Sequence, residues 1–119
     1  MPHLRIETNV PEANIPKDLP AKLCQVLAKS LGKPVSYCVA TVVGGVNMSW
    51  GGSTVPCAQA TLMSIGALGV EPNKKHSAAI FEVITKELGI ADDKMYIHFM
   101  DAPSANVGFQ GTTFKDILG

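Results

Sequence analysis

The sequence repeats itself at an offset of 57 residues, the separation between residues 29 and 86. Three residues near the end of one helical stretch recur near the end of a second: Lys29, Leu31 and Gly32, then Lys86, Leu88 and Gly89. Each half reads as strand, long helix, strand, a unit that makes a parallel strand pair through a right-handed crossover. The repeat predicts an α+β fold, in which two pseudo-repeated β-α-β units form a four-stranded mixed sheet with both helices on one face.

The periodicity of apolar residues places these elements. Residues 3–9 alternate between apolar and polar, which is typical of a half-buried strand. Residues 17–31 and 75–88 carry apolar residues three and four apart, which predicts helices that end at the repeated glycines. Further strands are expected where β-branched and apolar residues run together, at 35–43, 57–65 and 95–100, with a Gly- and Ser-rich loop at 46–56 and short extended pieces at 107–118.

The predicted strand at 35–43 has no charged face. Its two alternating sets are Val39, Thr41 and Val43, and Cys38, Ala40 and Val42. Strands of this kind are normally buried on both sides. Because one layer of helices covers only one side of the sheet, we infer that the second side packs against other subunits.

Composition excludes several classes of function. The chain has 10 Lys plus Arg against 10 Asp plus Glu and no basic run, so nucleic-acid binding has no electrostatic support. Its 119 residues, 46% of them hydrophobic, are expected to form one domain over 1–119. No stretch resembles a secretory signal or reaches the length of a membrane span, so we expect a cytoplasmic protein without membrane insertion. The three cysteines are an odd number without a C-x-x-C pair, and we expect free thiols.

The first candidate for chemistry is Pro2. The residue after Met1 is small, so we expect Met1 to be removed, which leaves proline with a free secondary amine. An ordinary terminal amine has a pKa of about 7.7–8.0, and burial or a nearby cation lowers it. Such an amine is a general base or a nucleophile. The alternative is that Met-Pro is merely how the chain begins.

Other candidates are few. Lys33 directly follows the helix stop at Gly32 and is either a solvated cation at a helix C-terminus or part of a site. Tyr96 and His98 alternate on one predicted strand and share a face, as ordinary strand residues or as a polar pair in a pocket. Cys57 has no arranged partner, so a buried structural cysteine is expected. The histidines His3, His76 and His98 are far apart, so we expect no zinc site and no cofactor.

Together, a series of short motifs in order resembles the macrophage migration inhibitory factor family, which includes the close relative D-dopachrome tautomerase. The motifs are the opening MP, TNVP at 8–11, LGKP at 31–34, WGGS at 50–53, PCA at 56–58, SIG at 64–66, YI at 96–97, VGF at 107–109 and TTF at 112–114. The match runs almost end to end and leaves only a few residues after Phe114. We expect an invertebrate source.

The resemblance implies a keto–enol tautomerase that assembles as a homotrimer, with the sheets wrapped into a barrel-like core and the active sites between neighbouring subunits. Pro2 matches the catalytic base, Lys33 the cation beside it, and Ile65 a residue that binds the substrate. Tyr96 would reach in from the adjacent subunit, together with His98. The slot for the substrate's ring would be formed by Val107, Phe109, Tyr37 and Phe114.

The implied substrate is a small aromatic keto acid such as a phenylpyruvate, or a dopachrome-type compound, and no cofactor is needed. The resemblance also implies a cytokine-like immune mediator, secreted without a signal peptide, with a cell-surface receptor as partner. The alternatives are a receptor-binding homologue whose catalytic pocket is vestigial, and a purely structural trimer.

Three residues depart from the family pattern. His98 stands where the vertebrate cytokine has asparagine, which changes the hydrogen bonding and adds a titratable group. Ala60 stands at the second cysteine of the family's C-x-x-C motif, so a thiol-oxidoreductase activity is not carried over from the family to Cys57. His3 replaces an apolar residue beside the proline.

Overall fold

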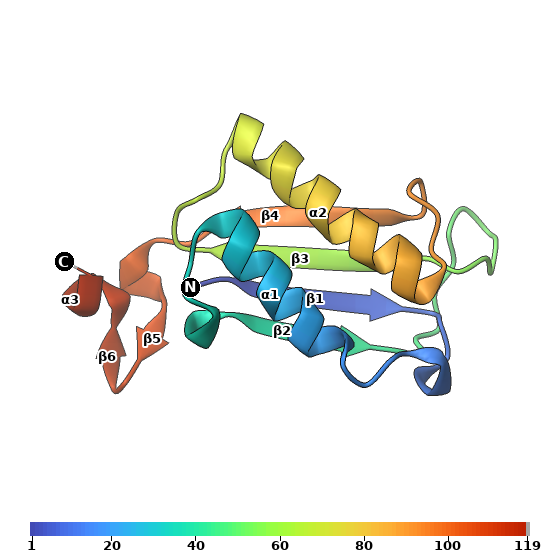
Figure 1. Ribbon diagram of the computed structural model, residues 1–119, viewed down its shortest axis with the longest axis horizontal. Helices are drawn as coiled ribbons and strands as arrows, with labels where there is room; N and C mark the ends of the chain where they lie inside the picture. Colours follow the sequence, from blue (N-terminus) through green and yellow to red (C-terminus); the bar gives the residue numbers. More distant parts are fainter. Residues whose placement is uncertain (119) are drawn as a thin grey trace.

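A four-stranded sheet forms the centre of the computed structural model, which describes residues 1–118 (Figure 1). The strands are β1 (His3–Thr8), β2 (Val39–Val43), β3 (Ala58–Ser64) and β4 (Met95–Asp101), in the spatial order β2-β1-β3-β4. The pairs β1–β2 and β3–β4 are parallel, and β1–β3 is antiparallel. Each half of the repeat therefore supplies one parallel pair, and the expected mixed sheet of an α+β fold is confirmed.

The two long helices, α1 (Leu19–Leu31) and α2 (Val70–Leu88), lie on the same side of the sheet (Figure 1). Each ends at its repeated glycine, Gly32 or Gly89, and both glycines have a φ of 67°. This left-handed conformation is unfavourable for residues with a Cβ, and it lets the next N–H groups bond to the last helical carbonyls. The repeat in the sequence is therefore a repeat of the helix stop.

Three predicted boundaries were wrong. Residues 35–37 form a 3-10 helix, η2 (Val35–Tyr37), because Pro34 leads into a tight turn, and the strand begins only at Val39. The second helix begins at Val70 rather than 75, since Pro72 sits in the first turn, where no backbone N–H is needed. The expected extended pieces are the short pair β5 (Gly108–Phe109) and β6 (Thr112–Thr113), but the chain ends in a helix, α3 (Phe114–Leu118). Two further 3-10 helices are η1 (Glu12–Asn14) and η3 (Ser104–Asn106).

The core lies between the sheet and the two helices. In β1, Leu4, Ile6 and Thr8 are completely buried while Arg5 is exposed, which confirms the predicted alternation. Large, fully buried apolar side chains of the core come from both layers, among them Leu4, Ile6, Leu19, Leu23, Leu27, Leu62, Ile80 and Ile84. Burying side chains of this size is the main driving force for folding.

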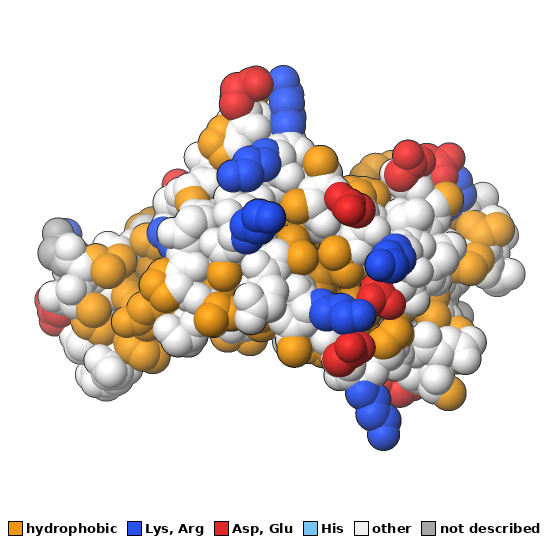
Figure 2. All heavy atoms as spheres, in the orientation of Figure 1, with side chains coloured by type: hydrophobic (Ala, Val, Ile, Leu, Met, Phe, Trp, Pro, Cys, Tyr) orange, Lys and Arg blue, Asp and Glu red, His pale blue; other side chains and the backbone are white. Residues whose placement is uncertain are grey.

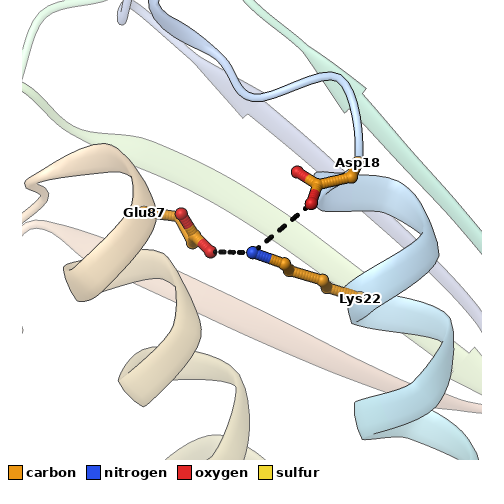
Figure 3. Close-up of polar contacts among 3 residues, drawn as sticks. All are labelled: Asp18, Lys22 and Glu87. Carbon is orange, nitrogen blue, oxygen red and sulfur yellow. Dashed lines mark hydrogen bonds and ion pairs between the residues drawn. The ribbon is translucent and has the colours of Figure 1, made fainter.

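An ion pair connects the two helices at the surface (Figure 3). The Nζ of Lys22 in α1 donates to Oε1 of Glu87 in α2 at 2.6 Å and lies 3.5 Å from Oδ2 of Asp18. The hydrogen bond to Glu87 raises the pKa of Lys22. Lysines and acidic residues are interspersed over this face (Figure 2), as expected of a helical layer in contact with water.

The opposite side of the sheet, here called the open face, is not covered by any element of residues 1–118 (Figure 1). It is partly apolar, since Val39 and Met100 are 44% and 46% exposed. It also carries Arg5 and Glu7, which are paired at 3.5 Å. The face is therefore more polar than the residues of β2 alone indicated. No helix in the described part of the chain is long and apolar enough to span a membrane.

Candidate active site

Pro2 is fixed at one end of the sheet. It directly precedes β1, its side chain is fully buried, and its carbonyl oxygen accepts a hydrogen bond of 3.0 Å from the N–H of Val39 at the start of β2. The alternation that buries Leu4 and Ile6 also turns Pro2 towards the helical layer. The start of the chain is therefore held against the beginning of β2.

The terminal amine lies in an environment that disfavours its charge. Burial lowers the pKa of the Met1 amine, and the nearby charge of Lys33 lowers it further. The thiol of Cys38 acts in the opposite direction. However, burial also raises the pKa of Cys38, so that its thiol is neutral near pH 7 and opposes Lys33 little.

Met1 decides whether Pro2 is a base. While Met1 is attached, the nitrogen of Pro2 belongs to a peptide bond and has no basicity. Removal of Met1 moves the amine one residue closer to β1, onto a residue that is itself buried. We expect burial at this position to disfavour the charged form of the secondary amine of Pro2 as well.

Lys33 and Ile65 meet beside this end of the sheet. The Nζ of Lys33, one residue beyond the stop of α1, donates to the carbonyl oxygen of Ile65 at 3.0 Å. Ile65 directly follows β3, whose end lies beside the start of β1 because the strands are antiparallel and His3 pairs with Met63. The antiparallel junction of the two halves therefore places Ile65 near Pro2.

The predicted aromatic residues form one cluster at the same end. The ring of Tyr37 packs edge-on against Phe109 and Phe114, with centroids 5.7 and 6.0 Å apart, and Phe109 stacks on Phe114 at 5.1 Å. The carbonyl oxygen of Val107 accepts the N–H of Phe114 at 3.0 Å. β5, β6 and α3 lie beyond the end of the sheet at which the chain starts (Figure 1). The structure thus brings the predicted ring-binding residues together.

Tyr96 and His98 share the open face, as predicted, but lie far from Pro2 within the chain. Tyr96 pairs with Gln59, and Gln59 pairs with Glu7, near the other end of β1. From Glu7 to Pro2 the strand runs for about 17 Å, and β4 is two strand spacings, about 10 Å, from β1. Within a single chain the predicted site is therefore incomplete.

Trp50 is a neighbour of Tyr96 that sequence reasoning missed. Tyr96 is 72% exposed, and the ring of Trp50 lies against it with centroids 4.7 Å apart. The Nζ of Lys94 is 6.0 Å from the centre of the Trp50 ring. The sequence did offer one signal for Trp50, because it is the only tryptophan and stands in a Gly-rich loop.

The acidic residues, the cysteines and the hollow along α2 add no residue to the predicted site. Within residues 1–118, no three His, Cys, Asp or Glu side chains are placed to hold a metal ion. Cys57 is completely buried, and Cys24, Cys38 and Cys57 are free thiols. A hollow of about 610 Å³ lies along α2 and is lined by Val70 and Phe81 among others, but by none of the predicted site residues.

Comparison with known proteins gives a consistent result. The family model described as "Macrophage migration inhibitory factor (MIF)" matches residues 1–115. A "Macrophage migration inhibitory factor homolog" of Trichuris trichiura is 40% identical over 96% of this chain and 100% of its own length. The "D-dopachrome decarboxylase-B" of Xenopus laevis is 41% identical over 94% of this chain and 96% of its own. The chain belongs to the macrophage migration inhibitory factor family.

Solved structures of the family confirm the fold. The structure of the macrophage migration inhibitory factor from Trichinella spiralis has a TM-score of 0.91 and 37% identity, and covers 94% of this chain and 99% of that protein. A homologue from Prochlorococcus marinus has a TM-score of 0.87 and 34% identity over 94% and 98% of the two chains. In this family member, the last residues of α3 lie beyond the matched region, which ends at residue 115.

Proposed function

We propose that this member of the macrophage migration inhibitory factor family is a keto–enol tautomerase with Pro2 as its general base. The observation that carries the proposal is the position of the chain start, where Pro2 is buried and the terminal amine one residue earlier lies beside Lys33. Burial and that cation lower the pKa of the Met1 amine, and we expect both to act in the same direction on the amine of Pro2 once Met1 is removed. A lowered pKa leaves more of the amine unprotonated near neutral pH, as a base requires. The substrate class is a small aromatic keto acid such as a phenylpyruvate, or a dopachrome-type compound.

The reaction moves one proton. The neutral amine of Pro2 takes a proton from the carbon next to the substrate's carbonyl group, and the electrons of that C–H bond form the enolate. The protonated amine then gives the proton to the enolate oxygen, which yields the enol, and ketonisation is the same pair of proton transfers in reverse. Lys33 pairs with the carboxylate or the enolate oxygen, where a fixed positive charge stabilises the developing negative charge. These steps need no metal or organic cofactor.

The partly exposed rings of Tyr37 and Phe109 would give the substrate's ring a surface to bind, with the buried Phe114 packed against both. Tyr37, Phe109 and Phe114 lie at the Pro2 end of the sheet with their rings in mutual contact. Aromatic rings prefer stacked or edge-on neighbours and lose exposed area when they bind. A ring bound there would direct the reactive carbon of its keto-acid side chain towards Pro2.

The proposed assembly is a homotrimer in which each active site lies between two chains. Tyr96 and His98 cannot reach the Pro2 of their own chain, so a neighbouring chain would have to supply them. A contact between the Pro2 end of one chain and the Tyr96 end of the next joins two different surfaces, and such contacts form a closed ring when the rotation from chain to chain closes. The open face, with its exposed Val39 and Met100, would be covered by this arrangement.

Replacement of the base tests the proposal. In Pro2→Gly, Met1 is still followed by a small residue, and the ketonisation rate of hydroxyphenylpyruvate should fall about 100-fold or more. Intact mass shows whether Met1 has been removed, and sedimentation shows whether the assembly persists. A second variant with Ala inserted between Met1 and Pro2 keeps every native side chain but turns the proline nitrogen into an amide. Full activity in either variant with Met1 processed would contradict the proposal.

A second role is proposed from family membership, because relatives of this chain bear the name of the cytokine. In that role the protein is secreted without a signal peptide and binds a cell-surface receptor. A cell response that persists in Pro2→Gly would favour receptor binding independent of the catalytic site. Absence of any response to the wild-type protein would contradict this role.

A further inference from the structure

The turn that supplies the partner of Lys33 is itself held by hydrogen bonds from three elements. This turn, residues 65–69, connects β3 to α2, and we call it the β3–α2 turn. Lys33 donates to the carbonyl of Ile65 at 3.0 Å, and Oδ1 of Asp101, at the end of β4, accepts the N–H of Gly66 at 3.0 Å. His76 in α2 contacts the carbonyl oxygen of Ala67 through Nε2 at 2.8 Å.

The backbone of this turn needs such support. Ala67 has a φ of 63°, a left-handed conformation that is unfavourable for a residue with a Cβ. Gly66 before it has a φ of 74°, where glycine is at no disadvantage. Contacts from outside the turn therefore have to hold Ala67 in this conformation.

His76 is buried and uses both ring nitrogens. Its side chain lies in the core with 2% exposure, and Nδ1 is 2.6 Å from the hydroxyl oxygen of Ser30 in α1. Because the Ala67 carbonyl only accepts hydrogen bonds, Nε2 carries the hydrogen, and in the neutral ring Nδ1 then accepts from the Ser30 hydroxyl. With a neutral imidazole, both ring nitrogens of His76 have a hydrogen-bond partner, one in Ser30 and one in Ala67. The proposed reaction uses neither Ser30 nor His76.

We propose that Ser30 and His76 are positioning residues for Lys33. They fix Ala67, and thereby the carbonyl of Ile65 two residues earlier, so that the ammonium group of Lys33 stays beside the amine of Pro2. The inference rests on the proposed function for its catalytic meaning. Its physical content, a hydrogen-bonded link from the core to the Lys33 ammonium, can be measured without activity.

The expected consequence is a change in the pH dependence of the amine. The terminal amine faces Lys33 and the thiol of Cys38, and the turn is also bound by Asp101. If the turn relaxes, Lys33 loses its carbonyl acceptor and is no longer held near the amine. The amine then loses part of the effect that lowers its pKa, so a higher pH is needed to deprotonate it.

The test compares His76→Leu, which removes both hydrogen bonds, with His76→Gln, whose side-chain amide can still donate to Ala67. Two quantities are measured: the pH–rate profile with phenylpyruvate, and the titration of Pro2 followed by its ¹³C chemical shifts. In His76→Leu, the acidic limb and the titration should move to higher pH, with KM raised several-fold. In His76→Gln, both should stay near wild type. Ser30→Ala, a milder change, should shift both in the same direction if His76→Leu does not fold.

Two controls separate positioning from packing. Ile80→Val removes a methyl group from a buried residue of α2 that does not bond to the turn, and it should lower stability without moving either titration. In a Lys33→Ala background, His76→Leu should produce no additional shift. An unchanged Pro2 titration in both His76→Leu and Ser30→Ala would overturn the inference. A shifted titration in a protein without tautomerase activity would overturn the proposed function alone.

Discussion

The two ends of the sheet differ in how their predicted site residues are held. At the Pro2 end, Pro2 is buried and Lys33 is bound to a carbonyl that the rest of the fold fixes in place. At the other end, Tyr96 is 72% exposed and has the ring of Trp50 as its aromatic neighbour. The first end is built by the chain itself. The second end exposes a side chain to its surroundings, which is what a group needs if it is to act on another copy of the chain.

The antiparallel pairing of β1 and β3 is the origin of this difference. It brings the end of β3 to the start of β1, so that Ile65 and Lys33 meet beside Pro2. The same pairing, followed by the parallel pair β3–β4, sends the beginning of β4 to the opposite end. A residue such as Tyr96, near the beginning of β4, is therefore excluded from the Pro2 site of its own chain.

The largest expected effect comes from mixing two inactive variants. Pro2→Gly and Tyr96→Ala disable opposite ends of the sheet, so each variant alone should be nearly inactive. When equal amounts are unfolded and refolded together, random assembly should give about a quarter of the sites an intact Pro2 and an intact Tyr96 from different chains. The ketonisation rate of hydroxyphenylpyruvate measures the recovery.

A matched mixture shows whether recovery depends on the two ends. Pro2→Gly and Lys33→Ala disable the same end, so no site in their mixture combines an intact Pro2 and Lys33 from one chain. This mixture should show no more activity than its two components. Equal recovery in both mixtures, or none in the first, would mean that the ends are not joined between chains.

A smaller effect is expected when Lys33 is replaced. Lys33→Ala removes a cation that lowers the pKa of the terminal amine, so that pKa should rise. Because the unprotonated amine is the active form in the proposed mechanism, the loss of rate should be greater at acidic than at alkaline pH. Loss of a charged contact to the carboxylate should also raise KM, on the order of tenfold. The measurement is the pH–rate profile with phenylpyruvate.

The control for Lys33→Ala is Lys29→Ala, which replaces an exposed lysine one turn earlier on α1. A pH–rate profile identical to wild type in Lys33→Ala would contradict the role assigned to Lys33.

The smallest effect is expected at the exposed end. Trp50→Leu removes the ring that packs against Tyr96, so Tyr96 should be less well positioned and KM should rise about threefold, with little change in kcat. Trp50→Phe keeps an aromatic neighbour and should stay close to wild type. The fluorescence of the single tryptophan should also change when substrate binds, and this change should disappear in Tyr96→Ala. A fluorescence response that is the same in Tyr96→Ala would show that Trp50 senses the ligand by another route.

Local patterns in the sequence predicted most of the fold. The repeated helix stops at Gly32 and Gly89 and the alternation in β1 are local signals, because each depends on residues close in the chain. Two of the three wrong boundaries lie where a proline changed the local geometry, at η2 after Pro34 and in the first turn of α2 with Pro72. These prolines set backbone angles that the apolar pattern does not report.

The site was less accessible to sequence reasoning than the fold. Pro2 and Lys33 were candidates from their place in the sequence, whereas Ile65 and the aromatic residues were named only through a family resemblance. The proximity of these residues follows from strand register, which no local pattern contains. His76 looked like an isolated histidine, since its partner Ser30 is 46 residues away in the sequence. Arg5 and Glu7 were read as the solvent side of one strand, although pairing with β2 and β3 places them in the middle of the open face.

The two edge strands of the sheet also affect the stability of the protein. β2 and β4 are the outer strands of the order β2-β1-β3-β4, so each pairs on one side only. Unpaired strand edges beside an uncovered, partly apolar face readily bind other chains, correctly or as aggregates. For a chain that covers these surfaces only in an assembly, the free energy of unfolding includes the free energy of association. Its melting temperature then rises with protein concentration, and dilution destabilises it as heating does.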